Sequence, residues 1–188
     1  MVAISSNMIP LGSKAYDFKL MDATSNQLKT LKEIQSDKGT VVLFIRNRCP
    51  YVEHILEKLI ELAREYIPKG ISFVAINSNV PEMYPDDTLE EMEKFAKNHD
   101  FPFPYLDDPT QVAAKGFGAA CTPDFFVFDK DMKCVYRGQF DDSRPENDHQ
   151  VTGKSLREAL DALLGNKKVA TEQHPSYGCR IKWQDSKD

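Results

Sequence analysis

The fold follows from one stretch of this sequence, Thr40-Val41-Val42-Leu43-Phe44-Ile45-Arg46-Asn47-Arg48-Cys49-Pro50-Tyr51-Val52. Its first six residues are apolar or β-branched and predict a buried strand. Beyond Cys49, apolar residues recur with the three-and-four spacing of an amphipathic helix, at Val52, Ile55, Leu56, Leu59, Ile60, Ala63 and Tyr66. Cys49 therefore lies where a strand ends and a helix begins.

This position favours chemistry at the thiol of Cys49. The free N–H groups and the positive dipole end of a starting helix stabilise a thiolate, and Arg46 and Arg48 add positive charge. Both effects lower a cysteine pKa from about 8.5 toward neutrality, and the thiolate is the form that reacts. The alternative is that Cys49 is a small buried hydrophobe, as most free cysteines are, and position alone leaves both interpretations open.

The length and composition indicate one globular domain. A chain of 188 residues with 41% hydrophobic content can bury a full core without a second domain. We predict that residues 1–165 form this domain and that residues 166–188 form a C-terminal tail that carries Cys179. Tyr177, Ile181 and Trp183 are the residues expected to anchor the tail to the domain.

The charge and the cysteine content narrow the class of protein. A formal net charge of −5 offers no general basic surface for nucleic acid or an anionic membrane. The first residues lack a basic segment followed by a long apolar run, and no stretch approaches the roughly 18 apolar residues of a membrane span, so we expect a cytoplasmic protein. Four cysteines are too few and too scattered for a disulfide scaffold, which leaves redox chemistry or no special role.

The remaining pattern alternates strands and helices. A second buried strand is predicted at Ile71–Ile76, and because a helix separates it from the first, the two strands should be parallel. Asp87 or Thr88 should cap a helix that ends near His99. The other predicted elements are a strand at Ala15–Leu20, an extended segment at Phe101–Tyr105, a short helix at Pro109–Lys115, a hairpin of Phe125–Phe128 and Met132–Arg137, and a helix at Ser155–Leu164. The order predicts an α/β fold with a central mixed sheet flanked by helices, an N-terminal extension and a C-terminal tail.

This order of elements, with a cysteine after the first strand of the βαβ unit and a Thr-Pro pair before the hairpin, resembles the thioredoxin superfamily. Four segments resemble more specifically its peroxiredoxin-like branch, the alkyl hydroperoxide reductase/thiol-specific antioxidant or redoxin family: Arg48–His54, Cys121–Phe126, Tyr136–Asp142 and Pro175–Cys179. The resemblance implies a thioredoxin-like fold and a redox-active thiol at Cys49. It also implies a cis peptide bond between Thr122 and Pro123 that faces this thiol, which makes both residues candidates for substrate binding.

The sequence departs from the better-known relatives at two places. A dithiol thioredoxin has its second cysteine three positions after the first, where this chain has Val52, so exchange within a Cys-x-x-Cys pair is excluded. A typical peroxiredoxin has threonine or serine three positions before its reactive cysteine and proline four positions before that, where this chain has Arg46 and Val42. Disulfide exchange and peroxide reduction therefore both stay open as activities.

A reactive thiolate needs a second thiol to release it from a sulfenic acid or a mixed disulfide. Cys121 is the preferred candidate, because it lies two positions before Pro123 in the loop that this fold places beside the reactive thiol, and a bridge forms if the Cα atoms are within about 7 Å. Cys179 is the alternative, since the neighbouring Gly178 would let a thiol on the tail swing in. Cys134 should be structural, on one face of a hairpin strand.

Charged residues near these thiols complete the candidate site. Arg48 and Arg137 are candidates for binding substrate, for example a peroxide oxygen, although Arg48 could face solvent and Arg137 could instead pair with Asp141 or Asp142. His54, about 140° around the helix from Cys49, is a weak candidate for a base. A metal site built from Cys49, Cys121, Cys179 and His174 would lack the short ligand spacing of zinc motifs, so we expect neither a metal nor an organic cofactor.

The sequence thus predicts an oxidoreductase in which Cys49 is the nucleophile and Cys121 or Cys179 the second thiol. Its substrate would be a protein disulfide or a peroxide, and a thioredoxin or a low-molecular-weight thiol would reduce it again. The alternative from a different class is a non-catalytic thioredoxin-fold scaffold that binds an extended peptide beside Pro123 by strand pairing. Unchanged behaviour of a Cys49→Ala protein would select the scaffold. The oligomeric state stays open.

Overall fold

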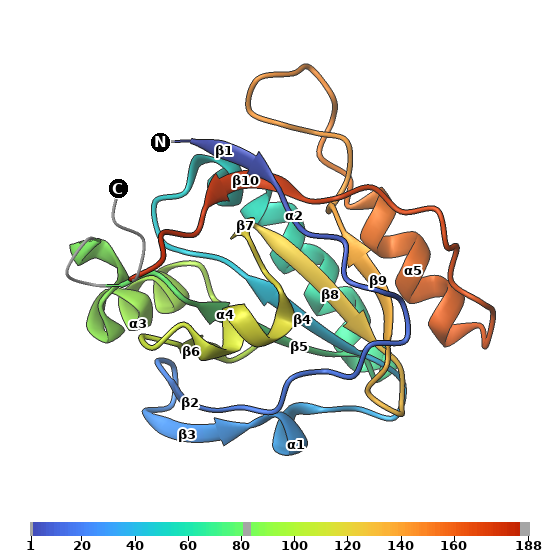
Figure 1. Cartoon of the computed structure of the whole chain (residues 1–188), viewed down its shortest axis with the longest axis horizontal. Helices are drawn as coiled ribbons and strands as arrows, with labels where there is room; N and C mark the ends of the chain where they lie inside the picture. Colours follow the sequence, from blue (N-terminus) through green and yellow to red (C-terminus); the bar gives the residue numbers. More distant parts are fainter. Residues whose placement is uncertain (1, 81–83, 185–188) are drawn as a thin grey trace.

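The computed structural model describes residues 2–80 and 84–184. Within these residues, a seven-stranded mixed sheet has the order β3-β2-β6-β5-β4-β8-β9 (Figure 1). Its strands are β2 (Lys19–Asp22), β3 (Gln27–Thr30), β4 (Thr40–Phe44), β5 (Ser72–Asn77), β6 (Tyr105–Asp107), β8 (Asp124–Phe128) and β9 (Cys134–Gly138). The helices are α1 (Leu31–Ile34), α2 (Pro50–Tyr66), α3 (Leu89–Asn98), α4 (Val112–Phe117) and α5 (Lys154–Leu164), with short 3₁₀ helices at Ile67–Lys69 and Pro85–Asp87. The predicted α/β fold with a central mixed sheet between helices is confirmed.

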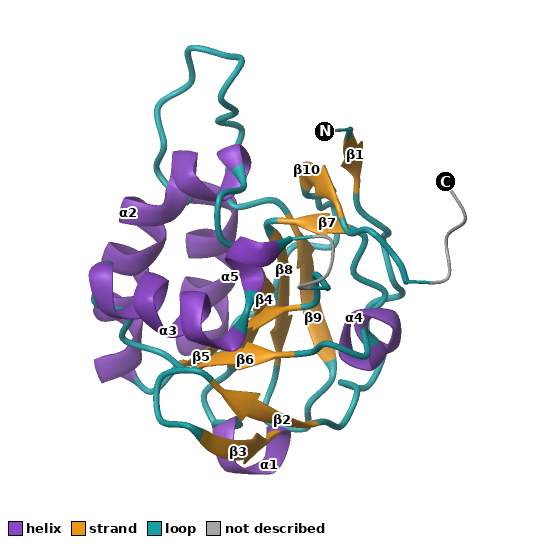
Figure 2. Cartoon of the chain, turned by 90° about the vertical axis from the view of Figure 1, so that its left-hand side faces the viewer, coloured by secondary structure: helices purple, strands orange, loops and turns teal. Residues whose placement is uncertain are grey.

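The helices cover both faces of the sheet. Figure 2 shows α2, α3 and α5 on one face and α4 on the other. Alternate side chains of the central strand β4 divide accordingly: Val41 and Leu43 pack in the apolar cluster with α2, whereas Val42 and Phe44 pack in the cluster with α4. All five residues of β4 are buried. A strand that is buried on both faces has a continuous apolar sequence, and this pattern allowed the strand at Thr40–Phe44 to be predicted correctly.

The two neighbours of β4 have opposite directions. β5 pairs with β4 in parallel, with Val42 opposite Val74, and β8 pairs with β4 in antiparallel, with Val42 opposite Phe126. Helix α2 makes the connection between β4 and β5 and buries its apolar residues from Val52 to Tyr66. This βαβ unit fixes Cys49 at the carboxyl end of the central strand. Among the described residues, no helix is long and apolar enough to cross a bilayer.

A second, three-stranded sheet was not predicted. It has the order β1-β10-β7, with β1 at Ala3–Ser5, β10 at Tyr177–Arg180 and β7 at Cys121–Thr122, and both pairings are antiparallel. Figure 1 shows β10 (red) between β1 (blue) and β7 (yellow), near the start of α2. The strands are two to four residues long and draw on segments far apart in the sequence, so no periodic pattern marks them.

The described part of the predicted tail runs along the domain. Ile181 is buried, and Trp183 packs against the apolar cluster on the α4 side of the sheet. Tyr177 is 39% exposed and contacts the ring of Tyr51 edge to face, with 5.7 Å between ring centroids. Residues 185–188 of the predicted tail lie outside the described residues.

Two predicted elements lie at residues other than those expected. The strand expected at Ala15–Leu20 is observed as β2 at Lys19–Asp22, because the carboxylate of Asp22 accepts hydrogen bonds from Thr24 and Ser25 and so builds the turn into β3. The helix expected at Pro109–Lys115 is observed as α4 at Val112–Phe117, since Asp108 accepts hydrogen bonds from the N–H groups of its first turn. Of the two candidate caps of α3, the structure selects Thr88.

Candidate active site

Cys49 is the N-cap residue of α2, and its side chain is 0% exposed. Its Sγ lies 3.2 Å from Sγ of Cys179, and the hydroxyl of Thr122 donates a hydrogen bond to it at 3.4 Å. The pKa of Cys49 is lowered to about 6, first by the hydrogen bond from Cys179 and then, against the opposing effect of burial, by Thr122, the N–H of Val52 and the charge of Arg46. The structure therefore makes Cys49 the thiolate of the pair.

Cys179 is the proton donor of this pair. It lies in β10 in register with Thr122 and is 2% exposed. Its pKa is raised, because it gives its hydrogen bond to Cys49 and because burial disfavours a second thiolate beside the first. All four cysteines carry free thiols. The two sulfurs are thus in contact without a bond between them, one ionised and one protonated.

The buried cation of the site is Arg46, not Arg48. The guanidinium carbon of Arg46 lies 4.5 Å from the ring centroid of Tyr84. Burial opposes its charge, but Cys49, Asp87 and Cys179 raise the pKa of Arg46 above its ordinary value. The side chain of Arg48 is 76% exposed and pairs with Asp86 at 3.0 Å. Its φ of +50° turns this residue out of the line of the strand toward solvent, so the structure does not bring Arg48 to the thiols.

The loop before β8 is arranged as the resemblance implied. The peptide bond between Thr122 and Pro123 is cis, and Thr122 faces Cys49 with both its hydroxyl and its carbonyl oxygen, which lies 3.3 Å from Sγ. Pro123 lines the cavity beside the start of α2. Thr122 is therefore next to the reactive sulfur, and the cis peptide bond joins it to Pro123.

Cys121 does not contact Cys49 in the way the sequence led us to prefer. Successive residues of a strand face opposite sides, so in β7 the turn of Thr122 toward Cys49 directs Cys121 away. The thiol of Cys121 lies 3.7 Å from the carbonyl oxygen of Pro123, and its pKa is raised well above the ordinary value by burial and by Asp124. The structure thus brings Cys179, the alternative candidate, to Cys49.

Arg137 holds two distant segments together. Its Nε donates to the carbonyl oxygen of Ile9 at 2.6 Å, and Nη1 donates to Oε1 of Gln173 at 2.6 Å. The expected ion pair with Asp141 or Asp142 was wrong, because Asp141 instead accepts hydrogen bonds from Ser143, Thr152 and Gly153 in its own loop. These contacts leave Arg137 as a link between the N-terminal segment and the tail.

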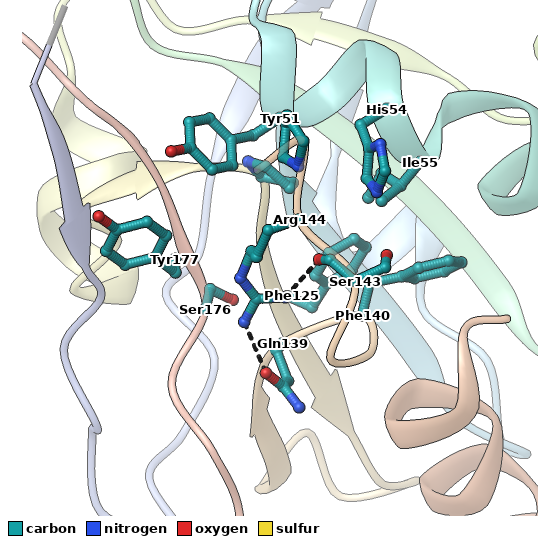
Figure 3. A pocket seen from close by; sticks show the side chains of 12 residues that line it. Tyr51, His54, Ile55, Phe125, Gln139, Phe140, Ser143, Arg144, Ser176 and Tyr177 are labelled. Carbon is teal, nitrogen blue, oxygen red and sulfur yellow. Dashed lines mark hydrogen bonds between the residues drawn. The ribbon is translucent and has the colours of Figure 1, made fainter. Parts of the chain in front are cut away.

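The small cavity that Pro123 helps to line is shown in Figure 3. Tyr51 and His54 of α2 line it together with Arg144, which donates to Oε1 of Gln139 at 2.7 Å. Its volume of about 20 Å³ suits about one water molecule. Nε2 of His54 is buried without a hydrogen-bond partner among the described residues, and His54 lines this cavity rather than contacting the thiols. The structure therefore gives His54 no position as a base for Cys49.

Two features of the site were not predicted from the sequence. They are the role of Gly178 and the carboxylate of Asp87, whose charge raises the pKa of Arg46. Gly178 was read as a source of flexibility, but a Cβ atom on it would lie 2.2 Å from the carbonyl oxygen of Thr122, so it permits a close approach of β10. A glycine inside a strand, directly before a cysteine, is the signal that indicates this. Asp87 was read only as a possible helix cap, and no pattern in the sequence links it to Arg46. In the described part of the chain, no three His, Cys, Asp or Glu side chains gather closely enough to hold a metal ion.

Comparisons with known proteins show what the chain is similar to. The chain is 26% identical over 154 residues to the thiol-disulfide oxidoreductase ResA of Bacillus thuringiensis, an alignment that covers 82% of this chain and 76% of that protein. Among solved structures, an uncharacterized conserved protein from Geobacillus kaustophilus is 54% identical, with a TM-score of 0.97 and coverage of 99% and 98% of the two chains. A hypothetical protein from Sinorhizobium meliloti is 48% identical, with a TM-score of 0.93 and coverage of 97% and 99%.

The model of the AhpC/TSA family matches residues 11–137. This range contains Cys49, Cys121 and the Thr122-Pro123 peptide bond, and it ends before Cys179. The expected thioredoxin superfamily and the expected class of enzyme, an oxidoreductase, are confirmed. Because the family model matches more than half of its length, the chain belongs to the AhpC/TSA family.

Proposed function

We propose that the protein is a thiol-disulfide oxidoreductase whose redox pair is Cys49 and Cys179. The observation that carries this proposal is the distance of 3.2 Å between the two sulfurs at the start of α2. The similarity to ResA, which is named a thiol-disulfide oxidoreductase, supports it. A thiolate and a thiol held in contact and shielded from water can form a disulfide after little movement of the chain. The scaffold hypothesis gives no reason for this contact.

The exchange proceeds in two steps. The thiolate of Cys49 attacks one sulfur of the substrate disulfide, a bond forms between them, and the other substrate sulfur leaves as a thiolate. Cys179 then loses its proton to that leaving thiolate and attacks the sulfur of Cys49, which releases the first substrate sulfur. The substrate disulfide gains two electrons and the Cys49–Cys179 pair loses two. A thioredoxin or a low-molecular-weight thiol would return the pair to the dithiol by the reverse exchange.

Neighbouring groups assist each step. Thr122 and the N–H of Val52 stabilise the attacking thiolate, and the charge of Arg46 keeps it ionised at neutral pH. The charge of Arg46 also favours the thiolate of Cys179. It lowers the pKa of that thiol, although the larger effects of Cys49 and of burial keep the pKa raised. Once Cys49 has formed a bond to substrate, its negative charge is gone, so deprotonation of Cys179 becomes easier at the moment the second step needs it.

The experiment that tests the proposal is oxidation of the fully reduced protein with one equivalent of oxidised glutathione, followed by peptide mapping without reductant. We expect a disulfide between Cys49 and Cys179, in the wild type and in Cys121→Ser. Cys179→Ser should stop at a mixed disulfide of Cys49 with glutathione. A bond between Cys49 and Cys121 in the wild type, or four unchanged thiols, would refute the assigned pair.

A second candidate is a thiol peroxidase, and the burial of the site favours it. Cys49 is 0% exposed and Cys179 2% exposed, so a small oxidant reaches the sulfurs more easily than a protein does. The thiolate of Cys49 would attack one peroxide oxygen and become a sulfenic acid as the O–O bond breaks, and the other oxygen would leave as water or an alcohol after it takes up a proton. Cys179 would then attack that sulfur, forming the disulfide and releasing water. Slow consumption of one equivalent of hydrogen peroxide by the reduced protein would exclude this activity.

The cytoplasmic location and the physiological reductant stay predictions.

A further inference from the structure

Asp124 is a buried carboxyl group that no step of the proposed exchange uses. It follows Pro123 directly, as the first residue of β8, and is 1% exposed. Three groups from different parts of the chain contact it: the hydroxyl of Ser6 donates to Oδ2, the N–H of Ala120 donates to the same oxygen at 3.4 Å, and Ser176 forms a further hydrogen bond. A carboxyl group is costly to bury without such bonds, so its place in the fold depends on these three segments.

One of these contacts holds the start of β10. Ser6 follows β1 and donates its backbone N–H to the carbonyl oxygen of Ser176 at 2.8 Å, which extends the antiparallel pairing of β1 with β10 by one residue pair. The hydroxyl of Ser176 lies between Asp124 and the carbonyl oxygen of Gly138, to which it is bonded at 2.6 Å. Ser176 stands three residues before Cys179. Asp124 therefore holds the chain at the point where it enters the strand of the second thiol.

Another contact holds the end of β10. Ile181 follows β10, and its N–H donates to the carbonyl oxygen of Ala120 at 2.9 Å. Ala120 is in turn the residue whose own N–H donates to Asp124. The side chain of Ile181 is buried as well. Cys179 thus lies between two anchored residues, and both anchors lead to the carboxyl group of Asp124.

The strand itself offers few other contacts that would fix its position. β10 has four residues and its partner β7 has two, so the ladder between them is short. The side chains of Tyr177 and Arg180 are exposed, and Gly178 has no side chain. A thiol attacks a neighbouring sulfur rapidly only while it is held close to the geometry of the attack. The position of Cys179 therefore depends on the anchors at the two ends of its strand.

We propose that Asp124 is the positioning residue of the second thiol, and that its carboxyl group keeps Cys179 at Cys49 by holding both ends of β10. This inference rests on the proposed function and assigns a residue to its second step. In that step Cys179, whose proton has passed to the thiolate released in the first step, bonds to the sulfur of Cys49, and the substrate sulfur bonded to Cys49 leaves as a thiolate. Asp124 acts on this step through β10 and not as an acid or a base.

The test follows the second step directly. The reduced full-length protein is mixed with one equivalent of oxidised glutathione and quenched with acid at successive times, and mass spectrometry measures the mixed disulfide of Cys49 with glutathione and the Cys49–Cys179 bond. Ser6→Ala removes one hydrogen bond to Asp124 and should slow the conversion of the first species into the second about tenfold, which corresponds to about 1.4 kcal/mol. Asp124→Ala should slow it further. Asp124→Asn keeps an acceptor oxygen and should restore nearly the wild-type rate.

A pH profile separates positioning of Cys179 from a general loss of stability. The hydrogen bond from Cys179 is the first cause of the lowered pKa of Cys49, so Ser6→Ala should move half-maximal alkylation of Cys49 by iodoacetamide to a pH above about 6. The matched control is Ser13→Ala, which removes a hydroxyl of the same N-terminal segment that donates to the carbonyl oxygen of Pro10 at 2.7 Å. This control should leave both the conversion rate and the pH profile unchanged.

The outcomes distinguish this inference from the proposed function. If Ser6→Ala and Asp124→Ala convert the mixed disulfide at the wild-type rate, Asp124 does not position Cys179 and the inference is overturned, while the redox pair stands. Ser6→Ala decides the question by itself if Asp124→Ala does not fold. Equal slowing in Ser13→Ala, or an Asp124→Asn protein as slow as Asp124→Ala, would overturn the inference as well. If the wild type forms no bond between Cys49 and Cys179, the proposed function itself fails.

Discussion

Cys49 and Cys134 are buried to the same degree and yet lie in opposite electrostatic environments. Cys49 is 0% exposed and Cys134 is 1% exposed. The pKa of Cys49 is lowered to about 6, whereas burial raises the pKa of Cys134 to about 11. Since burial disfavours a thiolate at both positions, the neighbours of each sulfur account for the difference.

The comparison shows what converts a buried cysteine into a nucleophile. Cys49 has a thiol donor, a hydroxyl donor, the N–H of Val52 and the charge of Arg46. Cys134 is the first residue of the edge strand β9 and packs in the apolar cluster that also contains Phe126 and Phe128. The position at the end of β4 and the start of α2, not exposure, therefore carries the reactivity.

The largest expected effect is the loss of exchange activity in Cys49→Ser. A serine hydroxyl is not ionised at neutral pH, so attack on oxidised glutathione should fall to the background rate. The matched control is Cys134→Ser, in which the hydroxyl can still donate to the carbonyl oxygen of Tyr136, 3.4 Å from Sγ in the wild type. This control should retain the wild-type rate of glutathione reduction. Full activity of Cys49→Ser would contradict the whole assignment.

The next effect is a difference in the pH dependence of alkylation. The rate of iodoacetamide reaction at Cys49 should be half-maximal near pH 6, the value to which its pKa is lowered, and should be constant above about pH 7. The rate at Cys134 should still rise toward pH 11. Mass spectrometry of the two peptides after timed quenching measures both rates in one sample. Parallel profiles for the two cysteines would remove the basis of the comparison.

A smaller change should follow from Arg46→Lys. Lysine keeps a charge but loses the planar guanidinium that lies over Tyr84, so its charge sits farther from Cys49. We expect the pKa of Cys49 to rise by about one unit, at the lower end of what a nearby opposite charge contributes. The absorbance of the thiolate at 240 nm against pH measures it. Arg48→Lys, at the exposed ion pair with Asp86, is the control and should leave the pKa unchanged. Equal shifts in both variants would contradict a specific effect of the Arg46 guanidinium on Cys49.

The sequence predicted those parts of this comparison that depend on local pattern. Three features were predicted correctly: the apolar run of β4, the apolar spacing of α2 and the start of this helix at Cys49. Each depends only on residues that are close together in the sequence. The sequence did not predict which of the two arginines faces the thiols. The positive φ of Arg48 and the burial of Arg46 depend on the loop around Asp86 and Asp87.

The pairing of Cys49 with Cys179 could be named only as an alternative. It depends on a four-residue strand that pairs on one side with β1 and on the other with β7, over sequence separations that no periodicity reports. The preference for Cys121 used proximity in the sequence to Pro123 and ignored the alternation of side chains in β7. Because the side chain of Thr122 faces Cys49, this alternation predicts that the neighbouring side chain of Cys121 faces away from Cys49.

The smallest expected effect concerns Asp124, a third buried ionisable group, directly after Pro123. Its pKa is raised to about 7 by burial, although Ser6 and Ser176 donate hydrogen bonds that lower it. Between about pH 4 and pH 7 the folded protein keeps a proton on Asp124 that the unfolded chain has lost. Stability from this group is therefore fully present below about pH 4 and is lost as the pH rises through about 7.

Asp124→Asn removes this dependence, since the amide oxygen still accepts from Ser6 and carries no charge at any pH. Relative to the wild type, the variant should gain on the order of 2 kcal/mol in free energy of unfolding between pH 5 and pH 8, measured by urea titration. Other titrating groups, such as Asp87, are common to both proteins and cancel in the difference. If the difference between variant and wild type were the same at both pH values, Asp124 would be ionised throughout. Burial would then not raise the pKa of a carboxyl group close to the Cys49 thiolate. The difference in pKa between Cys49 and Cys134 would in that case have to come from the groups that contact each sulfur, and not from burial.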